Sequence, residues 1–211
     1  GDITRFGVKQ RFYVLISQDP AKRAPYSEEW MLDHVPLTLG YFKQFEKVLK
    51  SRGSKVVKQF AEKTEYYAMF GIGSYTFARY RVVWKRMTNR MAATVLTSWK
   101  TPFGSKTVVA TDTTSLFTAN SADEAHYLCA ILNSKTIDDF VRSFSSGGRG
   151  FGAPSVFKDL AIPPFDERKR VHRRLAELSS EAHEAVDHDR EIADIEAQIN
   201  DAVEELWNLK R

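Results

Sequence analysis

The sequence contains little cysteine and no long apolar segment. Its single cysteine, Cys129, excludes an internal disulfide framework and favours a reducing, cytoplasmic setting. No apolar run approaches the roughly 18 residues that a membrane helix needs, and the beginning of the chain lacks a basic-then-apolar leader, so we expect neither a membrane span nor a signal peptide. Because the chain begins with Gly1 rather than methionine, we expect it to be part of a longer protein.

Acidic side chains are absent from residues 66 to 111, although this segment is rich in cations and aromatics. Its cations are Arg79, Arg81, Lys85, Arg86, Arg90, Lys100 and Lys106. Each Lys or Arg that meets a DNA phosphate releases condensed counterions, and aromatic rings can stack on or wedge between bases. We interpret the acid-free segment, residues 66 to 111, as a nucleic-acid face. A basic strand region whose aromatics fill the core is the alternative, and composition alone favours it.

The charge of the chain is unevenly distributed. Residues 1 to 165 hold 23 Lys and Arg against 14 Asp and Glu, a net +9, whereas residues 166 to 211 hold 8 against 13, a net −5. With 43% apolar residues in 211, the chain can bury one good core plus an appendage, or two small cores. The asymmetry points to a nucleic-acid partner for the basic body and a separate task for the acidic tail.

Alternating and β-branched runs predict strands at residues 10–17, 82–87, 92–96, 106–111, 114–118 and 161–165. A polar loop is expected up to Pro36, and a helix capped by Thr38 is expected to end at Gly53. Neighbours on a strand point to opposite faces, which predicts one face carrying Arg79, Arg81 and Lys85 and another carrying Val82, Trp84 and Arg86. One face of the sheet should therefore be basic.

Helical periodicity dominates the second half of the chain. Ser121 and Glu124 form a capping box before a helix, and a break at Asn133 precedes a second helix up to Phe144. Residues 145–152 hold four glycines and Arg149, which predicts either a phosphate-binding loop or a disordered connector. Beyond residue 165 a near-heptad pattern predicts two helices folded back on each other, or one long helix with a polar joint.

These elements predict an α+β fold: a curved mixed β-sheet lobe with packed helices over residues 1–165, then a helical, coiled-coil-like segment over residues 166–211. The first part would recognise a DNA target, and the second would space or dock that lobe.

The order of features resembles the DNA target-recognition domains of restriction-modification systems. Nearest are the C-terminal specificity regions of adenine-specific DNA methyltransferases of the TaqI kind and of fused type IIG enzymes; type I specificity subunits are more distant. The residues that carry the resemblance are those at 1–6, Pro36 with residues 41–52, residues 125–134, 146–152 and 160–165, His172 and residues 202–209. The tetrad Leu132-Asn133-Ser134-Lys135 and the segment Ile162-Pro163-Pro164 are the most specific of these.

The resemblance implies that this lobe reads bases beside an adenine that the parent enzyme flips out and methylates. It also implies S-adenosylmethionine in the parent's catalytic domain, no cofactor in this fragment, and two partners, double-stranded DNA and the chain's own N-terminal methyltransferase domain. A nuclease fused upstream is an open alternative. A protein-interaction module, in which the C-terminal helices bind a partner subunit, is the rival function.

Catalytic motifs are weak in this sequence. Adenine methylation needs an Asn or Asp before Pro-Pro-aromatic, and Ile162 stands there instead. The glycines at 71 and 73 lack the strand, helix and acidic residue of a nucleotide-binding loop, and His126 with Cys129 lacks the second pair of a zinc site. We therefore expect no catalytic, cofactor or metal residue. The DNA-contacting residues that we predict are Tyr75, Arg79, Arg81, Lys85, Arg86, Arg90, Lys106 and Arg149.

Overall fold

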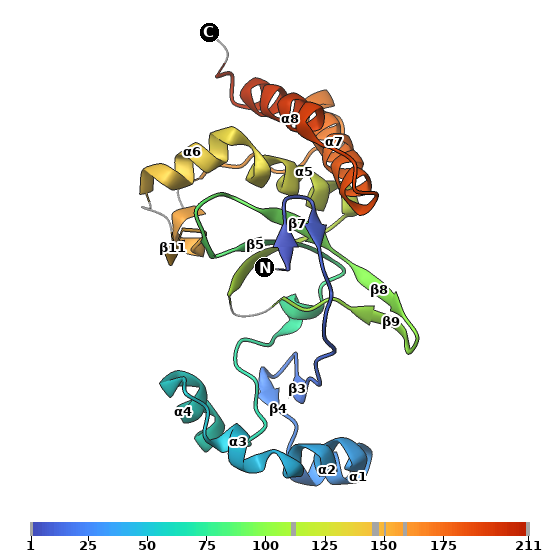
Figure 1. Ribbon diagram of the computed structural model, residues 1–211, viewed down its shortest axis with the longest axis vertical. Coiled ribbons are helices and arrows are strands. Elements are labelled where there is room, and N and C mark those ends of the chain that lie inside the picture. Colours follow the sequence, from blue (N-terminus) through green and yellow to red (C-terminus); the bar gives the residue numbers. More distant parts are fainter. Residues whose placement is uncertain (1, 111–112, 145–147, 150, 158–159, 210–211) are drawn as a thin grey trace. The chain divides into compact units, whose positions relative to one another are not determined.

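The computed structural model describes residues 2–110, 113–144, 148–149, 151–157 and 160–209 and divides the chain into two compact units. Unit 1 combines Gly1–Arg11 with Ala78–Arg211, and unit 2, Phe12–Phe77, is inserted between them (Figure 1). Helices and small antiparallel sheets alternate along the chain, so the predicted α+β class is confirmed. A functional division at residue 165 stays a prediction, because compactness divides the chain elsewhere.

Unit 2 is mainly helical. A hairpin of β3 (Gln18–Asp19) and β4 (Ala24–Pro25) precedes α1 (Glu28–His34), α2 (Pro36–Gln44), α3 (Glu46–Lys50) and α4 (Lys55–Lys63), and the 3-10 helix η1 (Ser74–Phe77) ends the unit. Its small core is built on Met31, Leu39 and Tyr67. The hydroxyl of Ser27 caps α1 by accepting from the backbone nitrogen of Trp30 at 3.2 Å.

Three expectations for unit 2 were wrong. The apolar segment at 10–17 forms no strand, and the side chains of residues Phe12 to Leu15 are exposed. The loop expected before Pro36 contains α1, whose acidic residues Glu28 and Glu29 lie in the first turn. The single helix expected from Thr38 to Gly53 begins earlier, with Pro36 at its first position, and breaks at Phe45 into α2 and α3.

Unit 1 is organised around a three-stranded antiparallel sheet in the order β10-β5-β7. Its strands are β5 (Tyr80–Lys85), β7 (Ala93–Leu96) and β10 (Thr114–Ala119), and Val83 of the central strand pairs with Leu116 and Thr94. Smaller pairs are β1 (Ile3–Thr4) with β2 (Gly7–Val8), β6 (Met87–Thr88) with β11 (Gly148–Arg149), and β8 (Ser98–Thr101) with β9 (Gly104–Thr107). Every pair among the described strands is antiparallel, which corrects the expected mixed sheet.

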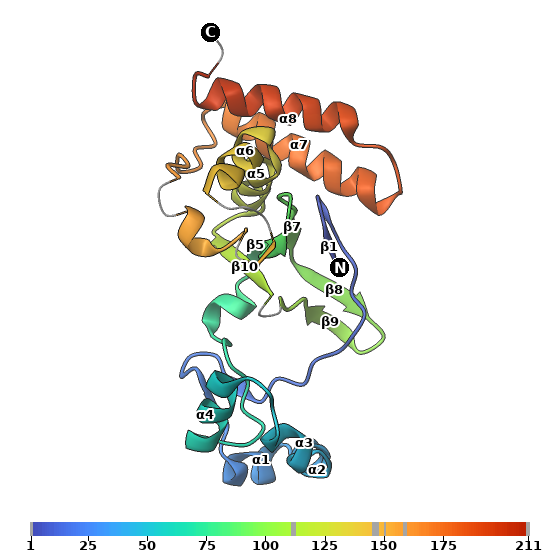
Figure 2. The same ribbon diagram turned by 60° about the vertical axis from the view of Figure 1, so that its left-hand side comes forward.

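Helices cover one side of this sheet (Figures 1 and 2). They are α5 (Ala122–Asn133), α6 (Lys135–Phe144), α7 (Arg170–Asp187) and α8 (Ala193–Leu206), with a short 3-10 helix, η2 (Pro154–Phe157), between α6 and α7. α5 packs between the sheet and α7, and α8 packs on α7. The N-cap at Ser121 is confirmed, because its hydroxyl accepts from the Glu124 nitrogen at 3.0 Å, whereas the Glu124 carboxylate accepts from the nitrogen of Asn120, one residue before the cap, at 2.7 Å.

The C-terminal part resolves an open alternative: α7 and α8 are two helices that fold back on each other. Their apolar residues, including Leu178, Ile199 and Val203, are buried in the main core of unit 1. The strand expected at 161–165 was wrong, since the segment pairs with no other strand and is held by side chains. The Tyr127 hydroxyl donates to the Pro163 carbonyl at 3.0 Å, and the Trp207 indole donates to the Ala161 carbonyl at 3.2 Å. Across the described residues, no helix is both long and apolar enough to cross a bilayer.

Candidate nucleic-acid interface

An exposed two-stranded ribbon lies in the last third of the acid-free segment. We call β8, β9 and the turn between them, residues 98–107, the ribbon. Trp99 pairs with Lys106 and Lys100 pairs with Ser105, so an aromatic ring and a cation share one face while a second cation lies on the other. The turn holds Phe103, which is 72% exposed, and Gly104, whose φ of 87° suits glycine.

Arg81 fixes the base of the ribbon. This residue is 1% exposed, and its guanidinium donates to the Val108 carbonyl at 2.7 Å and to the Thr97 carbonyl at 3.4 Å. Thr97 and Val108 are the residues that immediately precede and follow the ribbon. Burial lowers the pKa of Arg81, yet an arginine remains charged at any physiological pH. Arg81 is thus part of the interior and is not presented to a ligand.

The expectation of one basic sheet face was wrong. Alternation along β5 does separate Arg81 from Trp84, but both faces are covered by apolar side chains. Trp84 and Val82 belong to the main core beside α5 and α7, whereas Val83 packs with Leu96 and with Ile3 from the N-terminal hairpin. The cations that stay accessible lie at strand ends and in turns rather than on the flat of the sheet.

The other predicted residues of unit 1 occupy these ends and turns. Arg79 is exposed just before β5, with its guanidinium 5.1 Å from the centre of the Tyr80 ring. Lys85 ends β5 and is half-buried, Arg86 follows it and is exposed, and Arg90 is exposed in the turn between β6 and β7. Lys106 lies on the ribbon. Of the eight predicted residues, the structure brings only Lys106 onto the ribbon itself.

Tyr75 and Arg149 stand apart from this set. Tyr75 belongs to unit 2, where its hydroxyl donates to the Gly71 carbonyl and its ring lies 5.9 Å from the guanidinium of Arg23. The backbone of Arg149 pairs with Met87 in β11, while its side chain and most of the glycine-rich segment 145–150 lie outside the described residues. The predicted phosphate-binding role of this loop stays a prediction.

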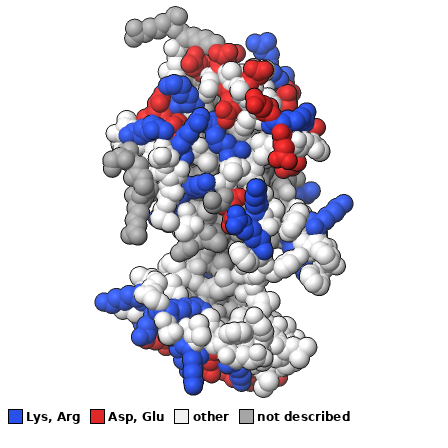
Figure 3. Space-filling view, in the orientation of Figure 1, with Lys and Arg blue, Asp and Glu red and all other residues white. Residues whose placement is uncertain are grey.

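Several accessible cations of the acid-free segment lack carboxylate neighbours. Among the described residues, none of these cations lies within ion-pair distance of an acid: Arg79, Lys85, Arg90, Lys100 and Lys106. Acids of the C-terminal helices instead pair with other cations: Glu184 with Arg190 at 3.3 Å, Glu205 with Arg170 at 3.9 Å and Glu196 with Arg5 at 2.7 Å. On the face in Figure 3, red side chains of unit 1 gather mainly over α7 and α8 at the top of the view.

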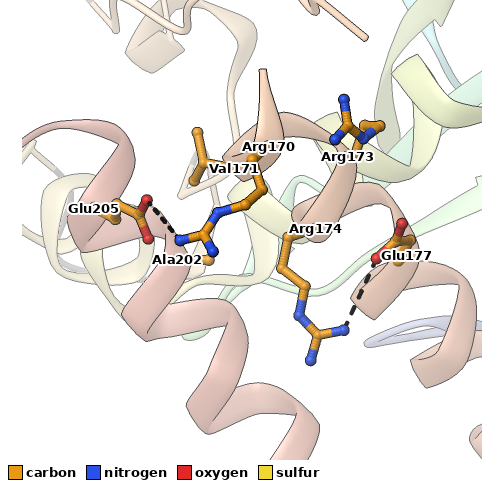
Figure 4. Close-up of a pocket in the computed structure, with 7 residues that line it drawn as sticks. All are labelled: Arg170, Val171, Arg173, Arg174, Glu177, Ala202 and Glu205. Carbon is orange, nitrogen blue, oxygen red and sulfur yellow. Dashed lines mark ion pairs between the residues drawn. The ribbon is translucent and has the colours of Figure 1, made fainter. Parts of the chain in front are cut away.

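A groove of about 290 Å³ lies between α7 and α8 and is lined by Arg170, Arg173 and Arg174 (Figure 4). Arg170 lies 3.9 Å from Glu205, and Arg174 lies 4.0 Å from Glu177. Since these carboxylates offset the arginine charge, the groove is poorly suited to phosphate. No group of three or more metal-ligating side chains occurs in the described ranges.

A buried histidine pair lies where α5, α7 and β7 meet. His183 Nε2 accepts from the Val95 backbone nitrogen at 3.0 Å, and His126 Nδ1 lies 3.2 Å from the Ser179 hydroxyl. Desolvation, helped by repulsion from His183, lowers the pKa of His126 to about 4. Both rings therefore act as neutral packing groups, and Cys129 nearby is fully buried, with desolvation raising the pKa of its thiol to about 12.

No protein-family model matches the chain, and a comparison with curated proteins returns no match. The candidate site therefore depends on geometry and charge alone. Sequence reasoning had not chosen Trp99, Lys100 or Phe103 as contact residues. The sequence could have indicated the hairpin that carries these three residues. Pro102 and Gly104 occupy the second and fourth positions of a tight turn between two polar alternating runs.

Proposed function

We propose that this chain is the sequence-reading DNA target-recognition domain of an adenine-specific DNA methyltransferase of a restriction-modification system, and that it has no catalytic site of its own. The observation that carries the proposal is the set of accessible cations without carboxylate neighbours in the acid-free segment. Exposed cations held away from acids retain their full attraction for phosphate, whereas paired ones would have to give up a partner first.

A second argument for the proposal comes from the residues that carry the family resemblance. Several of them connect the N-terminal motif, α5, α8 and β7 within unit 1. Arg5, from the N-terminal motif, forms an ion pair with Glu196 of α8 at 2.7 Å and donates to the Asn133 carbonyl at the end of α5. The Asn133 side chain in turn bonds both the nitrogen and the carbonyl of Ala93, each at 2.9 Å. Such joints suit a rigid platform that presents a reading surface.

The parent enzyme would contribute the S-adenosylmethionine site and the adenine pocket, and it would work in the cytoplasm, in keeping with the single buried cysteine. The rival function, a module whose C-terminal helices bind a partner chain, receives no comparable support. The apolar residues of α7 and α8 are already buried against α5 and against each other.

Selection from a pool of duplexes with randomised sequence tests the proposal. We expect the 211-residue chain to enrich one short motif, and the double variant Lys85→Gln, Arg90→Gln to bind every duplex more weakly. Arg190→Gln is the matched control, because Arg190 already pairs with Glu184. Failure of the unmodified chain to bind or enrich any duplex would refute the proposed function.

A further inference from the structure

The turn between β6 and β7, residues 89–92, is fixed by hydrogen bonds at both of its ends. The Thr88 hydroxyl donates to the Arg90 carbonyl at 2.9 Å and accepts from the Arg90 nitrogen at 3.3 Å. The Met91 nitrogen donates to a carboxylate oxygen of Asp138 at 2.6 Å, and the Met91 side chain is fully buried. The backbone of the turn therefore has a defined course.

The carboxylate that holds this turn is itself held in place. Asp138 lies in α6 and is 8% exposed, and its second carboxylate oxygen pairs with the Arg142 guanidinium at 2.9 Å. At the start of the turn, the backbone of Thr88 pairs with Gly148 between β6 and β11. Side chains that project from a turn supported on both sides keep their directions, as specific recognition requires.

Asn89 projects from this turn and has no partner in the fold. Its side chain is exposed, and it makes no hydrogen bond or ring contact with any residue across the ranges that the structure describes. The carboxamide offers two N–H donors and one carbonyl acceptor. The hydrogen bonds that close the turn come from Thr88 and Asp138, so those of the Asn89 side chain are left for a ligand.

The charges around Asn89 favour a polyanionic ligand. Residues 85–92 hold three cations and no Asp or Glu. Two of these cations, Lys85 at the end of β5 and Arg90 next to Asn89, have no carboxylate within ion-pair distance among the described residues. Contacts of cations with phosphates fix the register of a protein on a duplex, whereas sequence is read by groups that meet base edges. The uncharged carboxamide of Asn89 suits the second task.

We propose that Asn89 reads an adenine in the major groove of the target duplex and that Asp138 is the positioning residue that holds its turn. This inference rests on the proposed DNA-binding function and names a residue that carries specificity. A carboxamide can donate to adenine N7 and accept from the adenine N6 amino group at the same time, and no other base presents this pair of groups in the major groove. In the minor groove A·T and T·A look alike, so only the major groove supplies this discrimination.

The test repeats the selection from randomised duplexes with Asn89→Ala. At one position of its motif the original chain should prefer A·T about fivefold or more over every other pair, T·A included, and the variant should accept any pair there while it keeps its other preferences. Gln198→Ala is the matched control, because Gln198 is an exposed carboxamide of unit 1 on α8, and its motif should be unchanged. If Asn89→Ala selects the original motif, or only weakens all duplexes equally, the inference is overturned.

A modified base tests the contact at the level of one atom. With 7-deazaadenine at that position, which lacks N7 but still pairs with thymine, the original chain should bind roughly threefold or more weakly, and Asn89→Ala should bind both duplexes alike. The same loss in both chains would contradict the contact. If the original chain enriches no motif, the proposed function itself fails; if it enriches one that Asn89→Ala still prefers at every position, only this inference fails.

The positioning role has its own readout. Asp138→Ala removes the acceptor of the Met91 nitrogen and should relax the same motif position, whereas Asp138→Asn keeps an oxygen there and should retain the preference. Added to Asn89→Ala, Asp138→Ala should relax that position no further, because both act through one contact. Relaxation of a different position would refute the positioning role. Should Asp138→Ala prove unfolded, the role is decided by Asp138→Asn, whose loss of the preference would refute it, and the reading residue by Asn89→Ala.

Discussion

One guanidinium nitrogen of Arg81 lies 2.7 Å from the carbonyl oxygen of Val108, so a buried residue of the central strand β5 holds the residue that follows the exposed ribbon. The guanidinium itself is buried, so the hydrogen bonds that it donates to the Val108 and Thr97 carbonyls compensate for its lost hydration. Two arginines only two positions apart therefore differ in their surroundings: the side chain of Arg81 is buried, whereas that of Arg79 is exposed.

The variant Arg81→Met should destabilise the chain by about 1–3 kcal/mol, because it removes the charge-assisted hydrogen bonds that the buried guanidinium donates to two backbone carbonyls. Urea unfolding measures this free energy. Arg79→Met is the matched control and should unfold within about 0.5 kcal/mol of the original chain. Equal unfolding midpoints for the two variants would show that the bridge does not support the fold.

Acid should destabilise unit 1 through its histidine pair. The unfolded chain takes up a proton on each histidine near pH 6.5, whereas folded His126 does so only near pH 4, so the neutral form is favoured by folding. The contribution of His126 is complete above pH 6.5 and declines as the pH falls toward 4, by roughly 3 kcal/mol in all. Unfolding free energies measured from pH 7 to pH 4 check this.

Matched variants assign the acid effect. His126→Gln cannot titrate and should flatten the decline, whereas His34→Gln, at an exposed position of α1, should leave it unchanged. His183, whose pKa burial also lowers, is expected to keep part of the slope in the first variant. An identical pH dependence in the original chain and in His126→Gln would contradict the assignment.

Gly152 allows the chain to pass close to the central strand. A Cβ at this position would lie 2.2 Å from the Lys85 carbonyl oxygen, and the Gly152 carbonyl accepts from the Trp84 indole at 2.9 Å. Gly152→Ala should therefore cost about 1–3 kcal/mol, because two backbones must move apart. Gly53→Ala, where nothing lies within 4 Å, is the control, and equal melting temperatures would contradict the expectation.

The side chain of Asn133, at the end of α5, should contribute strongly to the stability of unit 1. Its side-chain oxygen and nitrogen bond the nitrogen and carbonyl of Ala93, and the residue is fully buried. Asn133→Ala takes away the side-chain acceptor of the Ala93 nitrogen and one of the two donors to the Ala93 carbonyl, the other being the Phe6 nitrogen, at a cost of about 1–3 kcal/mol in thermal or urea unfolding. Asn89→Ala, at an exposed turn position, should be nearly neutral. A neutral Asn133→Ala would remove this residue as the link between α5 and β7.

Signals that depend on neighbours in sequence predicted the structure well. The N-cap at Ser121 and the break before Lys135 were confirmed, because a helix satisfies its own backbone and its caps are local. The β-branched runs that became β5, β7 and β10 were also found, since each has a partner within the same unit.

Signals that depend on distant partners failed. Residues 10–17 have strand composition, but a strand forms only where another strand completes its hydrogen bonds. The alternation that set Arg81 apart from Trp84 was right, yet it could not show that Ile3, from the far end of the sequence, helps to cover the Arg81 face. The accessible cations of the acid-free segment therefore lie on the ribbon and in turns rather than on the flat of the sheet.

The most direct test of the account is the affinity of the 211-residue chain for duplex DNA as a function of salt concentration. If three to six of the accessible cations reach phosphates, log Kd against log salt should have a slope of roughly 3 to 5, and Lys85→Gln with Arg90→Gln should reduce it by about 2. A slope near zero, or no binding at low salt, would contradict the claim that the acid-free segment exists to hold DNA.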